Sequence, residues 1–481
     1  MDQEFRQFAL DFNKIENENN LFCDKVNGIE IWKYIRREVF RILLSKEYDV
    51  FHESKAKKEY RKKNTITADY SNLLQDLLVK YRKRKIFLQK KDILFFTMDR
   101  RLWADGRYLC PYTDLILDKL SISYTIMQIV ADENMALKTK TRNLRYLDQD
   151  AVLEKYADLE DRVNRAEANA LIQRLEKCFQ ITFDNNEKRE VGKNIEEAIR
   201  YRRIYKAYFK HVLNKLNPKV VCVLPSTRYI MMHLIETAKE CGIPVVEMQH
   251  GAVNDITIHH NYPTKQDIST YADYVFEFGE NLMKGVRYPI DDNKVIPIGY
   301  SYLEYFGAKS KEKVKKNSKL KTILILSSRQ DKLQELAIKL SEDLDPAKYR
   351  IIFKLHPHEY KIWKERFPLL RRSKVKVIGD DKFSLYYCLA KADIVLGVNT
   401  TALFEAVMFN VKILIYQDSD YQISKFLYEN GIAELISNYE QLQEAVTSKT
   451  EISGGLYDKV FTRNSIDNFN REIRKIINQK K

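Results

Sequence analysis

Short apolar runs alternate with helix-forming segments in residues 349–418, and this alternation limits the possible folds most strongly. Residues 351–353, 394–396 and 412–416 are rich in β-branched side chains and are bounded by turn residues. Such runs are typical of buried strands. A helix is predicted over residues 402–409, between the last two runs. Strands that alternate with helices form parallel sheets, so the sequence predicts an α/β protein.

Polar residues follow two of these predicted strands. His356 and Pro357 come after the first, and Asn399, Thr400 and Thr401 come after the second. Parallel sheets bind ligands at the carboxyl ends of their strands. Hydroxyls and backbone N–H groups at the start of a helix favour a phosphate group. We expect His356, one strand away, to donate to the same anion, which predicts a phosphate or diphosphate site.

The same alternation extends upstream and predicts two domains. The predicted strands of a first sheet are residues 93–97, 124–130, 219–224, 245–248, 274–278 and 295–298, and a second sheet begins at 322–326. The predicted organisation is a mainly helical region at 1–90, a Rossmann-like domain at 91–308 with a helical insertion at about 134–215, a linker at 309–320, a second Rossmann-like domain at 321–456 and a terminal helix at 457–481. A ligand-binding cleft is expected between the two domains.

The first 90 residues contain an amphipathic pattern at residues 26–44. Apolar side chains recur there with helical spacing, so a helix is predicted. Its Trp32 and Tyr34 are expected to pack on the main domain, with contact to lipid headgroups as the alternative.

A net charge of +15 indicates an anionic partner, unless the basic clusters are simply solvated helix faces. The clusters are residues 55–63, 80–91, 309–320 and 471–481. No zinc-finger, RNP-type or basic-zipper pattern accompanies them, so no nucleic acid partner is expected. An anionic membrane surface is kept as a possible partner. The absence of a long apolar run or signal peptide predicts a cytoplasmic protein, with a peripheral position on the inner membrane face as an alternative.

Several common site motifs are absent from the sequence. It contains no GxGxxG, no GxxxxGK[ST], no HExxH and no GxSxG. These absences argue against a dinucleotide-dependent dehydrogenase, a P-loop enzyme, a zinc protease and a serine hydrolase. The six cysteines form no CxxC pair, so free thiols are predicted and a zinc site is not.

A third polar group follows the predicted strand at residues 245–248. Gln249, His250 and Gly251 stand at its carboxyl end, facing the expected cleft. An imidazole whose pKa is near neutral suits a general base, so His250 is the predicted base for an acceptor hydroxyl. Asp105, an acidic residue before a glycine, is the alternative base. His259 and His260 are assigned to a loop.

Further donor-site residues are predicted in the second domain. Ser328 and Arg329 end its first strand, and a guanidinium there suits a bidentate phosphate contact. Glu405 lies one turn inside the threonine-capped helix, where it accepts ribose hydroxyls or forms an ion pair. The acidic stretch 418–420 is interpreted as a solvated turn, so no metal and no other cofactor is expected.

These residues resemble the motifs of GT-B-type transferases of bacterial surface polysaccharide assembly. Residues 354–357 and 399–401 are similar to the HP and S/T-S/T motifs of the teichoic-acid glycerophosphotransferases and the CMP-sialic acid and Kdo transferases, which implies nucleotide and phosphate binding. Residues 249–251 resemble the family's histidine-glycine motif, whose histidine is a proposed base, and residues 298–300 resemble its glycine turn. The resemblance covers about residues 219–450 and implies a GT-B-like fold, with the acceptor in the first domain and the nucleotide in the second.

The resemblance implies a glycosyltransferase of capsule or lipopolysaccharide biosynthesis. Such an enzyme moves a sugar from a nucleotide-activated donor, here favouring a CMP-sugar, to a glycan or lipid-linked acceptor. Three alternatives stay open: a CDP-glycerol-type polyol-phosphate transferase, a nucleotide-sugar 2-epimerase and a non-catalytic assembly subunit.

Overall fold

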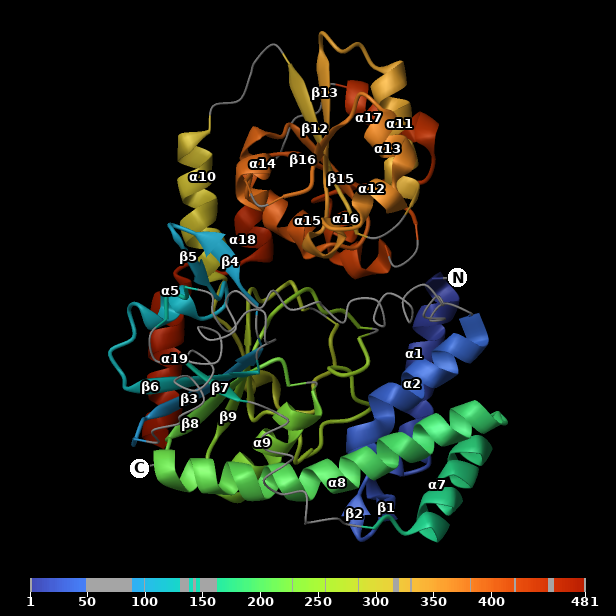
Figure 1. The fold of residues 1–481 in the computed structure, drawn as a ribbon, viewed down its shortest axis with the longest axis vertical. Coiled ribbons are helices and arrows are strands. Elements are labelled where there is room, and N and C mark those ends of the chain that lie inside the picture. Colours follow the sequence, from blue (N-terminus) through green and yellow to red (C-terminus); the bar gives the residue numbers. More distant parts are fainter. Residues whose placement is uncertain are drawn as a thin grey trace, which may run out of the picture.

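The protein consists of two α/β halves, one above the other in Figure 1. The computed structural model describes residues 2–48, 89–98, 100–129, 138–141, 144–147, 162–226, 228–255, 257–283, 285–314, 320–328, 331–380, 382–418, 421–448 and 454–479. Among these, no helix is long and apolar enough to cross a membrane.

The first domain is built on a seven-stranded sheet in which every pair of neighbours is parallel. Its strands are β3 (Ile93–Met98), β6 (Tyr124–Ile129), β7 (Leu144–Leu147), β8 (Val220–Leu224), β9 (Val245–Met248), β10 (Tyr274–Glu277) and β11 (Val295–Pro297). The spatial order is β7-β6-β3-β8-β9-β10-β11, so the chain reverses direction across the sheet between β3 and β8. Ligands bind at such a reversal in doubly wound sheets.

The second domain repeats this plan with six parallel strands. They are β12 (Lys321–Leu326), β13 (Tyr349–Lys354), β14 (Lys376–Ile378), β15 (Ile394–Gly397), β16 (Lys412–Tyr416) and β17 (Glu434–Ile436). The order is β14-β13-β12-β15-β16-β17, with the reversal between β12 and β15. Two Rossmann-like domains of this kind define the GT-B architecture, which confirms the predicted fold class.

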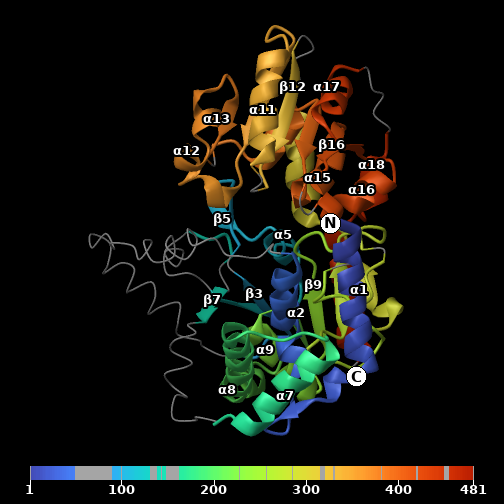
Figure 2. The ribbon, with the colours of Figure 1, turned by 90° about the vertical axis from the view of Figure 1, so that its right-hand side faces the viewer.

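A helical layer covers one side of the first domain (Figures 1 and 2). It contains α1 (Asp2–Glu18), α2 (Trp32–Tyr48), α7 (Arg165–Cys178) and α8 (Asn185–Leu216). Trp32 is fully buried and forms a cluster of three stacked rings with Phe12 and Phe179. Its packing role is therefore confirmed, although its immediate neighbours belong to this helical layer.

The amphipathic helix begins later than the sequence pattern predicts. A small hairpin, β1 (Lys25–Val26) and β2 (Ile29–Glu30), precedes α2. Asn27 and Gly28 form its turn, with φ of 53° and 72°. Asn-Gly is a strong signal for a two-residue hairpin, because both central residues of that turn need positive φ. The predicted helical start at residue 26 was therefore wrong.

The predicted helical insertion and the predicted linker have mixed outcomes. The segment 134–215 contains α7 and most of α8, but it also contributes β7 to the sheet edge. The segment 309–320 continues a helix, α10 (Ala308–Lys313), before residues 315–319, which lie outside the described residues. The basic cluster 55–63 and most of the cluster 80–91 also lie outside them.

The C-terminal helix returns to the first domain. Helix α19 (Ser465–Gln479) lies beside the lower sheet in Figure 1, near α5 (Asp114–Leu117). Its Phe469 is fully buried and packs against Phe95 of β3 and Phe276 of β10. The end of the chain therefore completes the core of its first domain.

The chain crosses back between the domains over two glycines. Helix α18 (Leu456–Val460) leads into this crossing, and a Cβ added at Gly279 would lie 2.0 Å from the carbonyl oxygen of Val460. A Cβ at Gly299 would lie 2.2 Å from the carbonyl oxygen of Thr462, and Gly299 has a φ of 95°. The backbone of the crossing segment thus packs directly on the ends of β10 and β11.

Gly299→Ala is expected to lower the free energy of unfolding by roughly 2–5 kcal/mol, the sum of backbone strain and overpacking. Gly431→Ala is the matched control, because Gly431 also has positive φ, at 63°, but nothing lies within 4 Å of its added Cβ. The control should lose only about 1–2 kcal/mol. Urea unfolding measures the loss of unfolding free energy in both variants. Equal losses would show that the crossing segment moves enough to accommodate the added methyl group.

Candidate functional site

The carboxyl ends of three neighbouring strands carry the predicted donor residues. Ser328 follows β12, and Thr400 follows β15, on the two sides of the chain reversal. Thr400 is the N-cap of α15 (Thr401–Glu405), where its hydroxyl accepts from the N–H of Ala402 at 3.4 Å. The sequence prediction of a threonine cap at a strand end is confirmed. Arg329 lies outside the described residues.

His356 follows β13 and caps a short 3-10 turn, Pro357–Glu359. Its Nδ1 accepts from the N–H of His358 at 3.3 Å, and its own N–H donates to the Glu359 carboxylate at 2.9 Å. Strand β12 lies between β13 and β15, so His356 is two strands from Thr400 rather than one. At about 4.8 Å per strand, the two residues suit opposite parts of an extended nucleotide better than a single phosphate.

Glu405 is buried on the domain interface. Its carboxylate accepts a hydrogen bond from the hydroxyl of Tyr386, and the charge of Arg100, from the first domain, acts on it. Burial raises the pKa of Glu405 to about 7, and the Tyr386 hydrogen bond and Arg100 oppose that rise. An acid of this kind exchanges a proton near neutral pH and accepts or donates a hydrogen bond accordingly.

The side chain of Gln249 forms hydrogen bonds within the first domain. Its side-chain amide donates to the carbonyl of Gly251 at 2.8 Å and accepts from the N–H of Phe278. The side chain therefore ties the end of β9 to the end of β10 and fixes the turn that carries His250. This geometry gives Gln249 a positioning role rather than contact with an acceptor.

The turn at His250 is fastened from a second side. The hydroxyl of Tyr112 donates to the carbonyl of His250 at 2.6 Å. Burial lowers the pKa of His250 to about 4, and the carboxylate of Glu247 only partly opposes this shift. This pKa lies below the near-neutral value expected from the sequence, because the enclosure of the ring depends on the tertiary fold. The imidazole is neutral, and so able to accept a proton, throughout the physiological pH range.

The two domains meet at the His250 turn and the start of α15. A Cβ added at Gly251 would be 3.8 Å from the Thr401 hydroxyl oxygen. Nearby, the side-chain amide of Asn254 donates to the carbonyl of Gln422 at 3.3 Å. The His250 turn of the first domain therefore faces the capped start of α15 in the second domain.

Asp105 occupies a different kind of position. With Gly106 it forms the turn between β4 (Leu102–Ala104) and β5 (Arg107–Leu109), with φ of 50° and 77°. Its carboxylate is exposed and accepts from Lys309 Nζ at 2.9 and 3.0 Å. The hairpin turn accounts for the Asp-Gly pair in the sequence. We therefore assign no catalytic role to Asp105.

The aromatic side chains around Glu405 were not predicted from the sequence. Tyr112 and Tyr300 stack with ring centroids 5.9 Å apart, and the guanidinium carbon of Arg100 lies 5.6 Å from the Tyr112 ring centroid. Tyr302 packs against Tyr386 across the interface at 5.3 Å. The only signal available was the position of Arg100 and Tyr300 just after strands β3 and β11.

Of the two histidines assigned to a loop, His260 is buried and His259 is partly buried. Nδ1 of His260 lies 3.0 Å from the Tyr271 hydroxyl, and its Nε2 lies 3.8 Å from a carboxylate oxygen of Glu247. Burial lowers the pKa of both histidines, that of His260 to about 3. Both histidines lie in a turn between β9 and β10, as the loop prediction has it.

Four histidines that the protein wholly or partly encloses should make its stability sensitive to acid: His233, His250, His259 and His260. Each has a pKa lowered by burial, so the unfolded chain takes up protons below pH 6.5 that the folded chain does not. Their stability contribution is complete above pH 6.5 and declines as pH falls toward 4. Five carboxyls whose pKa is raised by burial act in the opposite direction, so the net change of stability with pH does not isolate the histidines; they are Glu16, Asp114, Glu247, Glu277 and Glu405. A variant that removes one buried histidine isolates its contribution.

His233→Phe tests this account. Within the described part of the chain neither ring nitrogen of His233 has a hydrogen-bond partner, and the ring lies between Tyr34 and Tyr205. The variant should gain about 1–3 kcal/mol of stability at either pH, the cost of a buried unsatisfied polar group. At pH 5 it should gain more, because the unfolded wild-type chain protonates His233 there and the folded chain does not. The gain should shrink at pH 7. A gain that does not change with pH would show that His233 does not titrate on unfolding.

No group of three or more His, Cys, Asp or Glu side chains with metal-binding geometry occurs in the part of the chain that the structure describes. Of the acidic stretch 418–420, only Asp418 belongs to that part. The expectation that the enzyme works without metal stays a prediction.

Comparisons with known proteins find similarity in structure only. No protein-family model matches the chain, and no curated protein matches its sequence. Among solved structures, the UDP-GlcNAc 2-epimerase of Methanocaldococcus jannaschii is similar at 16% identity and a TM-score of 0.47, over 80% of this chain and 99% of the epimerase. MurG of Acinetobacter baumannii is similar at 12% identity and 0.43, over 80% and 99%. The wall teichoic acid polymerase TagF is similar at 8% identity and 0.44, over 85% and 96%. At these identities the similarity concerns architecture alone.

Proposed function

We propose that the protein is a GT-B-type glycosyltransferase that moves a sugar from a nucleotide-activated donor to a hydroxyl of a glycan or lipid-linked acceptor. The observation that carries this proposal is the approach of Gly251 to Thr401 across the domain interface. It sets a histidine turn on one wall opposite a threonine-capped helix start on the other. A group-transfer reaction needs these two functions on opposite sides of the reacting carbon.

The donor is proposed to lie along the ends of β13, β12 and β15. The N–H groups at the start of α15 and the hydroxyls of Thr400 and Thr401 favour the phosphate. His356 lies at the far end of the same row, and Ser328 lies between. Glu405, further along α15, is proposed to bind ribose hydroxyls. These groups stabilise the negative charge that develops on the departing nucleotide.

The acceptor is proposed to approach from the first domain. His250 accepts the proton of the acceptor hydroxyl as its oxygen attacks the anomeric carbon of the donor sugar. The bond from that carbon to the phosphate oxygen breaks, and the nucleotide leaves with the electron pair. Gln249 and Tyr112 hold the His250 turn during this step through the two hydrogen bonds described above.

A thermal-shift screen of nucleotides tests the proposal most directly. A ligand that binds only the folded state raises the melting temperature by mass action. Millimolar CMP, CDP, UDP and GDP are the probes, and a CMP-sugar donor predicts the largest shift with the cytidine nucleotides. If none of the four moves the melting curve, a nucleotide-dependent transferase is excluded.

Product analysis separates the transferase from the other enzymes that suit this architecture. With a bound nucleotide sugar and no acceptor, a transferase releases the nucleotide by slow donor hydrolysis and leaves the sugar's configuration at C2 unchanged. A nucleotide-sugar 2-epimerase instead returns the sugar epimerised at C2. A polyol-phosphate transferase would act on CDP-glycerol and release CMP. Nuclear magnetic resonance of the products distinguishes these outcomes.

A further inference from the structure

A groove of about 1110 Å³ lies between α7 and α8, at the edge of the helical layer that is away from the domain interface (Figures 1 and 2). Its α7 wall extends from Arg165 to Glu176, and its α8 wall extends from Lys188 to Arg200. On each helix most lining positions recur three or four residues apart, so their side chains lie on one face. The groove is therefore formed by two facing rows of side chains.

This groove carries an excess of positive charge. Six arginine or lysine side chains line it, against the two carboxylates of Glu176 and Glu196. Lys188 lies 3.1 Å from Glu176, and Lys193 lies 3.6 Å from Glu197 of the same helix, so these two lysines are compensated. The other four cations are exposed and have no ion pair within the part of the chain that the structure describes. They are Arg162, Arg165, Arg189 and Arg200.

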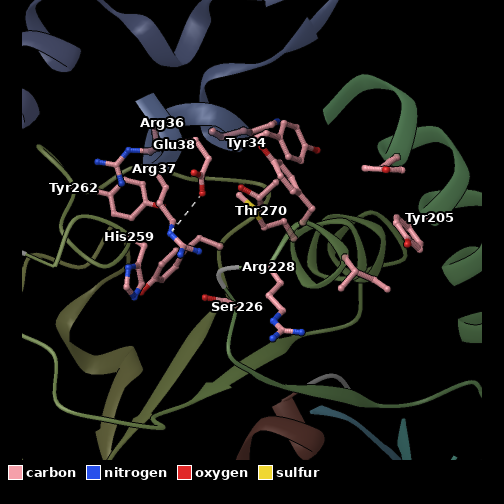
Figure 3. Close-up of a pocket in the computed structure, with 16 residues that line it drawn as sticks. Tyr34, Arg36, Arg37, Glu38, Tyr205, Ser226, Arg228, His259, Tyr262 and Thr270 are labelled. Carbon is pink, nitrogen blue, oxygen red and sulfur yellow. Dashed lines mark ion pairs between the residues drawn. The ribbon is translucent and has the colours of Figure 1, made fainter. Parts of the chain in front are cut away.

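A second pocket, between the helical layer and the first sheet, has no comparable excess of charge. It has a volume of about 420 Å³, and Figure 3 shows its side chains. Three of its four cations pair with carboxylates, in the pairs Arg36 with Glu16, Lys33 with Glu30 and Arg37 with Glu38. We therefore assign that pocket to the packing of the helical layer on the sheet and assign it no ligand.

Gly192, in the interior of α8, keeps the α7–α8 groove open. A glycine inside a helix makes the helix less stable than an alanine would. Packing does not require a glycine here, because an added Cβ would have one neighbour within 4 Å, the Ile172 side chain at 4.0 Å. The absent side chain leaves space for an occupant between the two rows of cations.

The groove also offers neutral hydrogen-bonding groups. Asn169 and Gln173, one turn apart on α7, line it with exposed side-chain amides that form no hydrogen bond among the described residues. Amides donate to and accept from hydroxyl groups, and guanidinium groups bind phosphate or carboxylate groups in a bidentate manner. This combination suits a ligand that carries both hydroxyls and anionic groups.

The arginines are spread along the groove rather than gathered at one point. At about 1.5 Å per helical residue, Arg189 and Arg200 lie roughly 16 Å apart along α8. A single small anion cannot contact both side chains. The spacing therefore favours an extended, chain-like occupant.

Two other polyanions fit the groove less well. Helices that bind a membrane surface insert large apolar side chains, and none of those exposed in the described ranges lines the groove. Single-stranded nucleic acid stacks its bases on aromatic side chains, and none of the described lining residues is aromatic. The lining therefore favours a glycan over a lipid surface or a nucleic acid.

We propose that the α7–α8 groove binds an anionic glycan chain, with its phosphate or carboxylate groups against the arginines. That this chain is the polymer on which the transferase acts rests on the proposed function. The groove lies away from the domain interface, so it holds a part of the chain distant from the reacting end and raises the effective concentration of that end at the cleft. The binding itself does not depend on the transferase function, because no donor-site residue lines the groove.

Isothermal titration calorimetry of the full chain with three soluble probes tests the binding. A hyaluronan decasaccharide carries carboxylates, a glycerol phosphate decamer carries phosphates, and maltodecaose is neutral. At least one anionic probe should bind about tenfold or more tightly than maltodecaose. Its affinity should fall as salt is added, because salt screens exposed charges. The tighter anionic probe shows whether the groove prefers phosphate or carboxylate.

Substitutions in the groove locate this binding. Arg165→Gln and Arg200→Gln should each weaken the preferred probe about threefold, in the range of one exposed ion pair. Gly192→Glu places a carboxylate between the arginines and should weaken it by about tenfold or more. Gly192→Gln has nearly the same volume without the charge and should have a smaller effect. Lys210→Gln is the control, because Lys210 is exposed on α8 and does not line the groove.

Three results would overturn the proposal: no binding of either anionic probe, equal binding of maltodecaose, or equal effects of Gly192→Glu and Gly192→Gln. Tighter binding of a single-stranded DNA of ten thymidines, or of phosphatidylglycerol vesicles, with the same response to the arginine variants would also overturn it, in favour of nucleic acid or membrane. The nucleotide thermal-shift screen reports separately on the transferase function. A protein that binds the anionic probe and no nucleotide would keep this proposal and lose the transferase.

Discussion

His250→Ala is expected to lower the turnover number by roughly 100- to 10,000-fold, the range for loss of a general base. Nucleotide affinity should stay nearly unchanged, since His250 belongs to the first domain and the donor is proposed to lie in the second. Because burial lowers the pKa of His250 to about 4, the wild-type rate should fall on the acid side only as pH approaches 4. With an unperturbed imidazole the rate would instead begin to fall near pH 6.5. The variant should lose this acidic limb.

His211→Ala is the matched control, because His211 is exposed on α8. Its turnover should equal that of wild type. Turnover numbers and nucleotide dissociation constants are measured for both variants, after circular dichroism has shown that each is folded. A His250→Ala variant with wild-type turnover would make this histidine a structural residue of the β9 end. A variant that loses nucleotide affinity would put His250 on the donor side of the cleft.

His356→Ala is expected to reduce turnover by about 100-fold or more, by comparison with removal of one donor from an oxyanion site. Unlike His250→Ala, it should also weaken nucleotide binding. The side chain has a second role, since its Nδ1 accepts from the N–H of His358 and caps the turn after β13. Loss of a cap costs about 0.5–2 kcal/mol of stability, which must be separated from the effect on the site.

His356→Asn makes that separation. Asparagine accepts the same capping hydrogen bond but offers no imidazole, so stability should return toward wild type while turnover stays low. His358→Ala removes the exposed neighbouring imidazole and is the control for nonspecific changes in this turn. Recovery of both stability and turnover in His356→Asn would reduce His356 to a capping residue.

Much of the fold follows from the sequence because its strands are short, apolar and well separated. The predicted strands that became β12 and β15 have their central residues fully buried, so the signal did not depend on long-range context. The order of the strands in each sheet was not predicted. The sequence analysis therefore predicted that His356 lies one strand away from Thr400. In the structure, β12 lies between the strands that carry these two residues.

The site was predictable where one residue type serves one local geometry. Thr400 at the start of a helix is such a case, and the structure confirms its cap. The raised pKa of Glu405 is not, because it depends on enclosure by Tyr386 and on Arg100, which is about 300 positions earlier in the chain.

The return of α19 to the first domain also bears on how the protein forms in the cell. Chains emerge from the ribosome N-terminus first, and domains generally fold in that order. Here Phe469 fills a position between β3 and β10, so the first domain lacks part of its core until nearly the whole chain has been synthesised. The second domain, complete with α18 by residue 460, is expected to reach its final structure first. A chain truncated after residue 464 and released from the ribosome should therefore show a protease-resistant second domain and a first domain that is still open to cleavage.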